Sequence, residues 1–363
     1  MKLLTHADLD AARQLGDEPA DRVIAALGSD VWTVNALLRH VHHNGEALPA
    51  AVPAAVRAFL EDDAVLPAWA DPVRIARAQA WASRHLFHVT VALFGASLPS
   101  SYGAAKGARV LVATGRMERA TLDRRVNETA QFILDVVAVD GFGPRGAALR
   151  AAQKVRLMHA AVRGHLLERG LGEGEVPINQ EDLLGTLFTF SAMVVRSVRM
   201  LGVEVSDQAA DDFQHLWAVV GVLLGIREEL LPEGHFASVE LGRRIGARQY
   251  AASEHGRALT AALLAGMEDH VPAFRSVPRH LVRYLVGDPL ADMIGIPADP
   301  SFQSKLALMR LVSGPASKPL GAIAANFTAL LGRPLLEGVV AAKLRGTTAA
   351  FAIPTKLRDA SAS

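Results

Sequence analysis

The sequence of 363 residues contains no cysteine, and aromatic residues make up only 6% of it. Without thiolates the chain cannot form disulfides, zinc–cysteine sites, iron–sulfur clusters, a thiolate-ligated haem or a haem attached through Cys-x-x-Cys-His. The shortage of aromatic residues disfavours β-sheets, in which they are enriched. Charge of one sign is also missing, because the net charge is +1. No strong field exists to attract nucleic acid or an acidic membrane surface.

Long hydrophobic runs are absent as well. The longest extends from Leu216 to Ile226, about half the length of roughly 20 residues that a membrane-spanning helix needs. The N-terminal stretch MKLLTHADLDAARQLG turns polar where a secretion signal requires an apolar segment. The sequence therefore predicts no transmembrane segment and a cytoplasmic protein.

What the chain does have is apolar content, at 50% of its residues, arranged with helical periodicity. We predict an all-α fold, a single large helical domain over residues 1–363. It would comprise lead-in helices (1–65), a catalytic core (66–300), C-terminal helices (301–355) and a frayed tail (356–363).

Glycine, proline and capping residues suggest where the helices begin and end. The glycine-rich stretch from Ser100 to Met117 is expected to be a connection. The expected helices cover 71–99, 118–140, 150–167, 179–202, 207–231 and 238–269, with shorter ones between 277 and 345.

The helix over 150–167 carries a histidine on its apolar stripe. Val155, Met158, Val162 and Leu166 follow the spacing of a buried face, and His159 lies among them. Arg156 and Arg163 are one helical turn away on either side. An imidazole that faces a core beside two guanidinium groups suits an axial metal ligand near an anionic cofactor. The alternative is a core histidine bonded to a backbone carbonyl, with two ordinary arginines.

The helix over 118–140 places Arg125 and Thr129 on the same face as Phe132, Ile133 and Val136. A charge among aliphatic side chains is costly unless it finds a partner. A bound anion or a polar pocket would provide one, and so would a neighbouring carboxylate.

Other histidines are weaker candidates for a site. His85 and His88 share a helix face with Trp81 and are potential cofactor neighbours, or simply packed side chains. The sequence HVHHN from His40 lies beside Gly45 and is expected to be a solvated loop.

Four segments, in this order, resemble the MpaB/rubber-oxygenase catalytic-domain family, which includes the latex-clearing proteins. They are RRVNETAQF from Arg124, KVRLMHAAVR from Lys154, VPINQEDLLGTLFTFS from Val176 and HLWAVVGVLLGIREELLP from His215. The resemblance spans roughly residues 69 to 300. It implies an all-α fold, globin-like in its core, that binds one b-type haem without a covalent link.

The resemblance also implies roles for particular residues. His159 matches the proximal iron ligand, and Arg125 and Thr129 match the family's Arg-x-x-x-Thr pair. The latex-clearing proteins have a lysine just before the threonine, where this chain has Glu128. Their pocket glutamate has no clean counterpart, since neither Arg109 nor Glu118 stands at the expected place. The resemblance therefore supports haem binding by this chain more strongly than it supports cleavage of polyisoprene.

Together these features predict an oxygenase that uses haem b and O2 on a small lipophilic, unsaturated, isoprenoid-like substrate. Arg125, Thr129 and Glu128 would be catalytic. His159 would ligate iron, with Arg125, Thr129, Arg156 and Arg163 around the cofactor and an arginine on a propionate. A haem sensor or storage protein, a haem peroxidase and a cofactor-free helical scaffold are the alternatives. Neither the electron donor nor the oligomeric state follows from the sequence.

Overall fold

The computed structural model describes residues 3–62, 65–113, 119–172, 174–270, 275–300 and 332–344. Within these ranges the chain is helical, and its only β feature is an isolated bridge between Ala104 and Tyr250. The all-α prediction is confirmed. The helices are α1 His6–Ala12, α2 Glu18–Leu27, α3 Val31–Leu38, α4 Ala54–Asp62, α5 Pro72–Arg84, α6 Leu86–Ala92, α7 Leu98–Gly103, α8 Ala105–Ala113, α9 Arg119–Val137, α10 Ala148–Glu168, α11 Gln180–Phe190, α12 Ala192–Met200, α13 Asp207–Leu223, α14 Gly234–Gln249, α15 Glu254–His270, α16 Val277–Val286, α17 Asp288–Met293 and α20 Arg333–Leu344.

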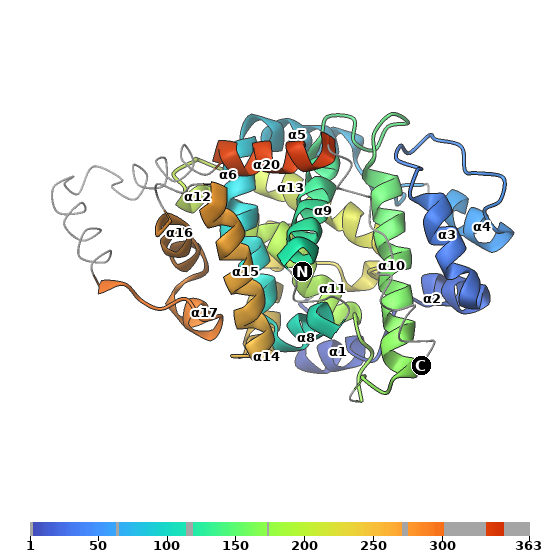
Figure 1. Cartoon of the computed structure of the whole chain (residues 1–363). Helices are drawn as coiled ribbons and strands as arrows, with labels where there is room; N and C mark the ends of the chain where they lie inside the picture. The colour runs from blue at the N-terminus through green and yellow to red at the C-terminus, as the bar shows by residue number, and fades with distance from the viewer. Residues whose placement is uncertain are drawn as a thin grey trace.

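Helix α10 separates two packing layers (Figure 1). On one side lie the N-terminal helices α2 to α4, whose apolar side chains form a small core with Leu157 and Ala160 of α10. On the other side α9 runs beside α10, with α15 beyond it. Helices α2 to α4 are therefore packed against α10, the helix that carries His159, on its side away from α9. Leu4 and Leu9, at and near α1, belong to the main core instead.

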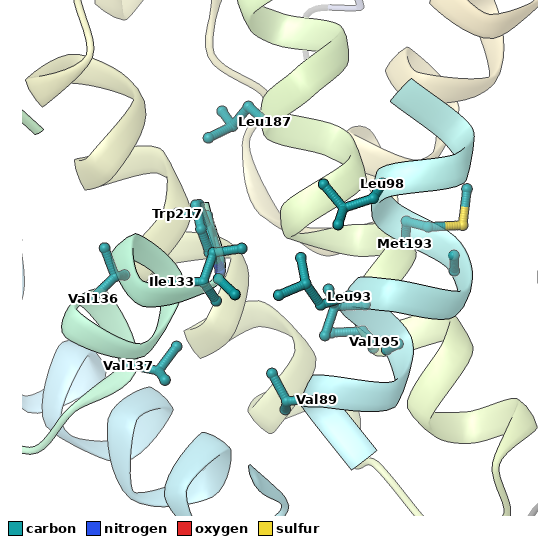
Figure 2. Close-up of a cluster of buried hydrophobic side chains, with 14 of the residues drawn as sticks. Val89, Leu93, Leu98, Ile133, Val136, Val137, Leu187, Met193, Val195 and Trp217 are labelled. Carbon is teal, nitrogen blue, oxygen red and sulfur yellow. The ribbon is translucent and has the colours of Figure 1, made fainter. Parts of the chain in front are cut away.

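The main core is built where α6, α9, α11, α12 and α13 meet (Figure 2). Ile133 of α9 lies against Trp217 of α13, and Val89 and Leu93 approach from the α6 side. Trp217 is fully buried. This dense packing fixes α9, which forms one wall of the cavity described below, and Trp217, which reaches that cavity from α13.

Several of the expected helices end early or are divided. The helix expected over 71–99 is divided at His85 between α5 and α6, and the one expected over 179–202 is divided at Ser191 between α11 and α12. The helix expected over 207–231 ends at Leu223, because Gly225 takes the left-handed conformation with φ of +87°. The helix expected over 238–269 is divided into α14 and α15, and the break contains the bridge between Tyr250 and Ala104. The main chain continues this contact, since Ala251 N donates to the Gly103 carbonyl.

The glycine-rich stretch after Ser100 was predicted to be a connection, and that prediction was wrong for its first part. Helices α7 and α8 occupy 98–103 and 105–113. Tight packing explains the glycine at Gly103, since a Cβ there would lie 2.4 Å from Leu290 Cδ1. The five residues before α7, Leu93–Ser97, form a short π-helix.

The C-terminal part contributes to the core rather than forming a separate layer. In the described portion of 301–355, α20 packs on α9, α6 and α15. The tail 356–363 lies outside the described residues.

One stretch, Gln180–Met200 in α11 and α12, is long and apolar enough to cross a membrane by length and composition. In the structure, 61% of its apolar window is buried inside the protein. The stretch packs in the core of this fold as the two helices α11 and α12.

The loop after α3 is anchored by Asn44. Its side-chain amide donates to the carbonyls of Gly141 and Gly143 at 2.9 and 2.7 Å, and its Oδ1 accepts from Arg150 N at 3.1 Å. These bonds attach the N-terminal layer to the turn between α9 and α10. His40, His42 and His43 are exposed, as expected of a solvated loop.

Replacing Asn44 by alanine removes three hydrogen bonds and leaves their partners partly buried. We expect the free energy of unfolding to fall by about 2–4 kcal/mol, because each unsatisfied buried group costs roughly 1–3 kcal/mol. Urea denaturation of Asn44→Ala measures the loss. His43→Ala, which truncates an exposed neighbour, is the control, and equal midpoints for the two variants would contradict the anchoring role.

Candidate functional site

A cavity of about 610 Å³ lies between α7, α8, α9, α10, α11, α14 and α15. This volume is in the range of small-molecule sites. Most of its wall is apolar, with side chains such as Phe94, Phe132, Phe190 and Leu263. The polar side chains of the wall include Tyr102, Arg125, Glu128, Thr129, His159 and Asp182.

His159 lines this cavity from the middle of α10. Val155, Met158 and Val162 of the predicted stripe line it too, while Leu166 packs in a separate apolar cluster. The Nδ1 atom of His159 is buried and has no hydrogen-bond partner among the described residues. Burial, followed by the charges of Arg163 and Arg125, lowers the pKa of His159 to about 3. The ring is therefore a neutral imidazole at any ordinary pH, which is the form that ligates metals.

Arg125 lines the cavity from α9. Its Nη1 donates to the Leu111 carbonyl at 2.8 Å. Across the described residues it forms no salt bridge, and burial lowers its pKa although Tyr102 and Glu128 act in the opposite direction. Among the carboxylates whose side chains the structure describes, Glu128 is the one that acts on Arg125. It lies three residues later on α9 and forms no hydrogen bond with Arg125. A cation in this position favours an anion in the cavity.

Thr129 and Glu128 follow on the same helix. The Thr129 hydroxyl donates to the Arg125 carbonyl at 2.9 Å, which leaves its oxygen lone pairs available. Glu128 is 7% exposed, and its Oε1 lies 3.3 Å from the Arg124 Nε without a well-formed hydrogen bond. Burial raises the pKa of Glu128 to about 7, against the effect of Arg124 and Arg125. This carboxyl group is therefore able to take up or release a proton near neutral pH.

Arg156 and Arg163 do not line the cavity. Arg156 binds Asp17 through two bonds, Nε to Oδ2 at 2.5 Å and Nη2 to Oδ1 at 2.9 Å, and lies over the Phe59 ring. Arg163 pairs with Asp21 at 3.0 Å. Both guanidinium groups pair with carboxylates of the protein itself. These ion pairs argue against the cofactor role that the sequence suggested for the two arginines.

His85 and His88 are also outside the cavity wall. Their rings are 6.0 Å apart, and His85 contacts Trp81. The described residues contain no group of three or more His, Asp or Glu side chains placed to hold a metal ion. The cavity offers a metal one imidazole, which suits a metal whose other positions a cofactor fills.

Sequence reasoning missed Tyr102 as a cavity residue. It comes from the stretch expected to be a connection, and burial raises its pKa to about 12. A single tyrosine at the end of a short helix carries no periodic signal that would have identified it. Trp217, within the predicted buried run, also reaches the cavity.

Comparisons with known proteins agree with this arrangement. Residues 84–314 match the family described as ER-bound oxygenase mpaB/B'/Rubber oxygenase, catalytic domain. A rubber oxygenase of Streptomyces sp. (strain K30) is 30% identical over 304 residues, which cover 80% of this chain and 73% of that protein. A solved structure described as latex clearing protein LCP in the closed state matches with a TM-score of 0.78 and 26% identity, over 91% of each chain.

The family match covers the helices that form most of the cavity wall. The matched segment contains α9, α10 and α11, so most of the residues around the cavity lie within the catalytic domain. Leu335 and Gly338 of α20 line the cavity from beyond it. The match extends over more than half of the chain, and the similar structure shares its overall fold. The chain therefore belongs to the MpaB/rubber oxygenase catalytic-domain family and is an oxygenase.

Proposed function

We propose that this protein is a haem b-dependent oxygenase that acts with O2 on a lipophilic, unsaturated substrate of isoprenoid type. One observation carries the proposal. A neutral imidazole, His159, lines an apolar cavity of about 610 Å³, and its Nδ1 atom has no hydrogen-bond partner in the described part of the chain. The names of its relatives, rubber oxygenase and latex clearing protein, support polyisoprene-like chains as the substrate class.

The residues of the cavity fit a haem. His159 would hold the iron through one ring nitrogen. Arg125, which has no salt bridge with a described residue, would neutralise a propionate. The apolar wall, with residues such as Phe132 and Phe190, suits both the porphyrin and a hydrocarbon chain.

When bound, the haem supplies activation of dioxygen. An iron held by histidine lacks the electron donation of a thiolate that assists O–O cleavage, and the chain has no cysteine. This favours attack on an activated alkene over hydroxylation of an unactivated C–H bond. The protein's own part is to orient the substrate in the apolar cavity, exclude water and place the Thr129 hydroxyl beside the reacting groups.

Glu128 would hold or accept a proton in the same cavity. Because its pKa is about 7, the carboxyl group is close to half ionised at neutral pH, which is the range in which a general base works best. A base has to be ionised before it accepts a proton. We therefore expect activity to rise as the pH increases through about 7.

Replacing Glu128 by glutamine is expected to remove this pH-dependent rise. It also changes stability. The folded pKa exceeds the unfolded value of about 4.3, so the folded state binds the proton more tightly between about pH 4 and 7. In the wild type the free energy of unfolding should fall by up to about 3 kcal/mol as the pH rises through this window. Glu128→Gln should lack that fall.

Urea unfolding and oxygen consumption, each measured from pH 5 to 8.5, test both effects. Glu168→Gln, at an exposed position on α10, is the control. If Glu128→Gln keeps the wild-type profile of both quantities, Glu128 is not the titrating group.

A haem sensor is a second candidate, favoured by one observation. Glu128 Oε1, at the cavity, forms no hydrogen bond with a described residue, although it lies 3.3 Å from Arg124 Nε, and it would give the iron a second protein ligand. An absorption spectrum typical of six-coordinate iron would support the sensor. The oxygenase requires a coordination position on the iron that is open to O2.

The activity itself is tested with the haem-loaded protein and a short oligo-isoprenoid. We expect oxygen uptake together with carbonyl products from the cleaved double bond. Oxygen uptake without cleaved product, or reaction only with peroxide, would favour the peroxidase alternative.

A further inference from the structure

The stretch from Arg13 to Asp21, here called the N-terminal strap, runs from the end of α1 into α2 and lies against α10 and α11. Side-chain bonds join the strap to α10 and α11, and a main-chain bond from Val176 N to the Arg13 carbonyl joins it to the loop before α11. Arg13 Nη1 reaches Glu181 at 3.0 Å and Asp182 at 3.2 Å on α11. Asp17 and Asp21 bind Arg156 and Arg163 of α10.

Gln180 joins the strap to the loop after α13. Its Nε2 donates to the carbonyls of Gly16 and Gly225 at 2.8 and 2.9 Å, and its main-chain N donates to the Leu15 carbonyl. The side chain is fully buried. The strap is thus continuous with the packed interior, although it lies outside the matched catalytic domain of 84–314.

We propose that the strap is the positioning device for His159, with Asp17 and Asp21 as positioning residues. Arg156 and Arg163 stand three residues before and four residues after His159, about 10 Å apart along the helix axis. Both lie about 40–60° around the axis from His159. Two ion pairs at these points fix the translation of α10 along its axis and its rotation about it. The inference rests on the proposed function for the role of His159 as ligand.

The ion pair between Asp17 and Arg156 is closely enclosed. Both side chains are at most 10% exposed, so loss of one partner leaves a buried charge uncompensated. Gly225 is held at φ +87° against this pair, and a Cβ there would lie 2.2 Å from Asp17 Oδ2 and 3.0 Å from Arg156 Nε. The space at residue 225 is therefore what permits the pair to form.

This geometry gives two independent ways to break the ion pair between Asp17 and Arg156. Asp17→Asn removes the charge, and Glu18→Gln is its control, because Glu18 forms an exposed pair with Arg22. Gly225→Ala displaces the carboxylate without changing any charge. Gly287→Ala is its control, since Gly287 has nearly the same φ, +86°, with nothing within 4 Å of an added Cβ.

Haem titration of the purified variants is the main experiment. We expect Asp17→Asn and Gly225→Ala to weaken haem binding by about tenfold or more, as losses of groups that orient a metal ligand do, and to alter the absorption spectrum. The two controls should bind as the wild type does. The charge-exchanged double variant, Asp17→Arg with Arg156→Asp, should recover part of the affinity. Variants that lose stability but keep wild-type haem affinity and spectrum would overturn the proposal, because the strap would then be structural only.

Hydrogen exchange in the protein without haem gives a second readout. Exchange of the α10 amides should accelerate at least about tenfold in Asp17→Asn and Gly225→Ala relative to their controls, while α5 amides stay protected. Unchanged exchange in α10 would contradict the strap's role. If the wild type binds no haem, the proposed function fails, and this exchange experiment alone decides whether the strap holds α10.

Discussion

Replacing His159 by alanine is expected to abolish tight haem retention. The described cavity wall offers no other imidazole, so the loss should exceed the roughly 10–100-fold effect of changing a group that merely orients a ligand. The helical circular dichroism signal should persist, because truncation inside a cavity leaves the packed faces of α10 in place. Pyridine haemochrome assay of the purified variant, together with haem titration, measures the effect.

His165→Ala is the matched control for this change. His165 stands six residues later on the same helix, outside the cavity wall, and should retain haem as the wild type does. Equal loss in both variants would show that α10 is merely destabilised, and would remove His159 from the site.

Arg125→Ala is expected to weaken haem binding strongly. If Arg125 neutralises a propionate, the change breaks a buried charge pair, and such a break commonly costs about 3–5 kcal/mol. The protein without haem should suffer much less. There Arg125 has no salt bridge with a described residue, and the bond to the Leu111 carbonyl is its hydrogen bond. Thermal unfolding with and without haem, combined with haem titration, separates the two cases.

Thr129→Val is the companion variant at the same wall. It keeps the shape of the side chain and removes a hydroxyl whose donated bond goes to its own helix. Haem spectra or oxygen reactivity should change more than folding does. If Arg125→Ala destabilises both forms equally while haem affinity is unchanged, Arg125 serves the protein scaffold and the site is reduced to α10.

The sequence predicted the cavity face of α10 well because helical spacing determines which side chains share a side. Val155, Met158, His159 and Val162 line the cavity together, as the pattern indicated. The same spacing could not show in which direction the long side chains of Arg156 and Arg163 extend. Their carboxylate partners lie about 140 residues earlier in the chain, at a distance that no local pattern encodes.

Helix ends were predicted less well for a similar reason. The division between α14 and α15 depends on the contact of Tyr250 with Ala104, and the short π-helix at Leu93–Ser97 has no local signature. That Glu128 belongs to the predicted site did follow from the family resemblance, in which a lysine stands at this position. The raised pKa of Glu128 did not, because it results from burial by neighbouring helices.

The most direct test of the central claim is the absorption spectrum of the purified wild-type protein after expression with added haem precursor. The account predicts a red-brown protein with a Soret band and one b-type haem per chain by pyridine haemochrome assay. A colourless protein that also fails to take up haem on titration would contradict it, and would identify the fold as a helical scaffold without this cofactor.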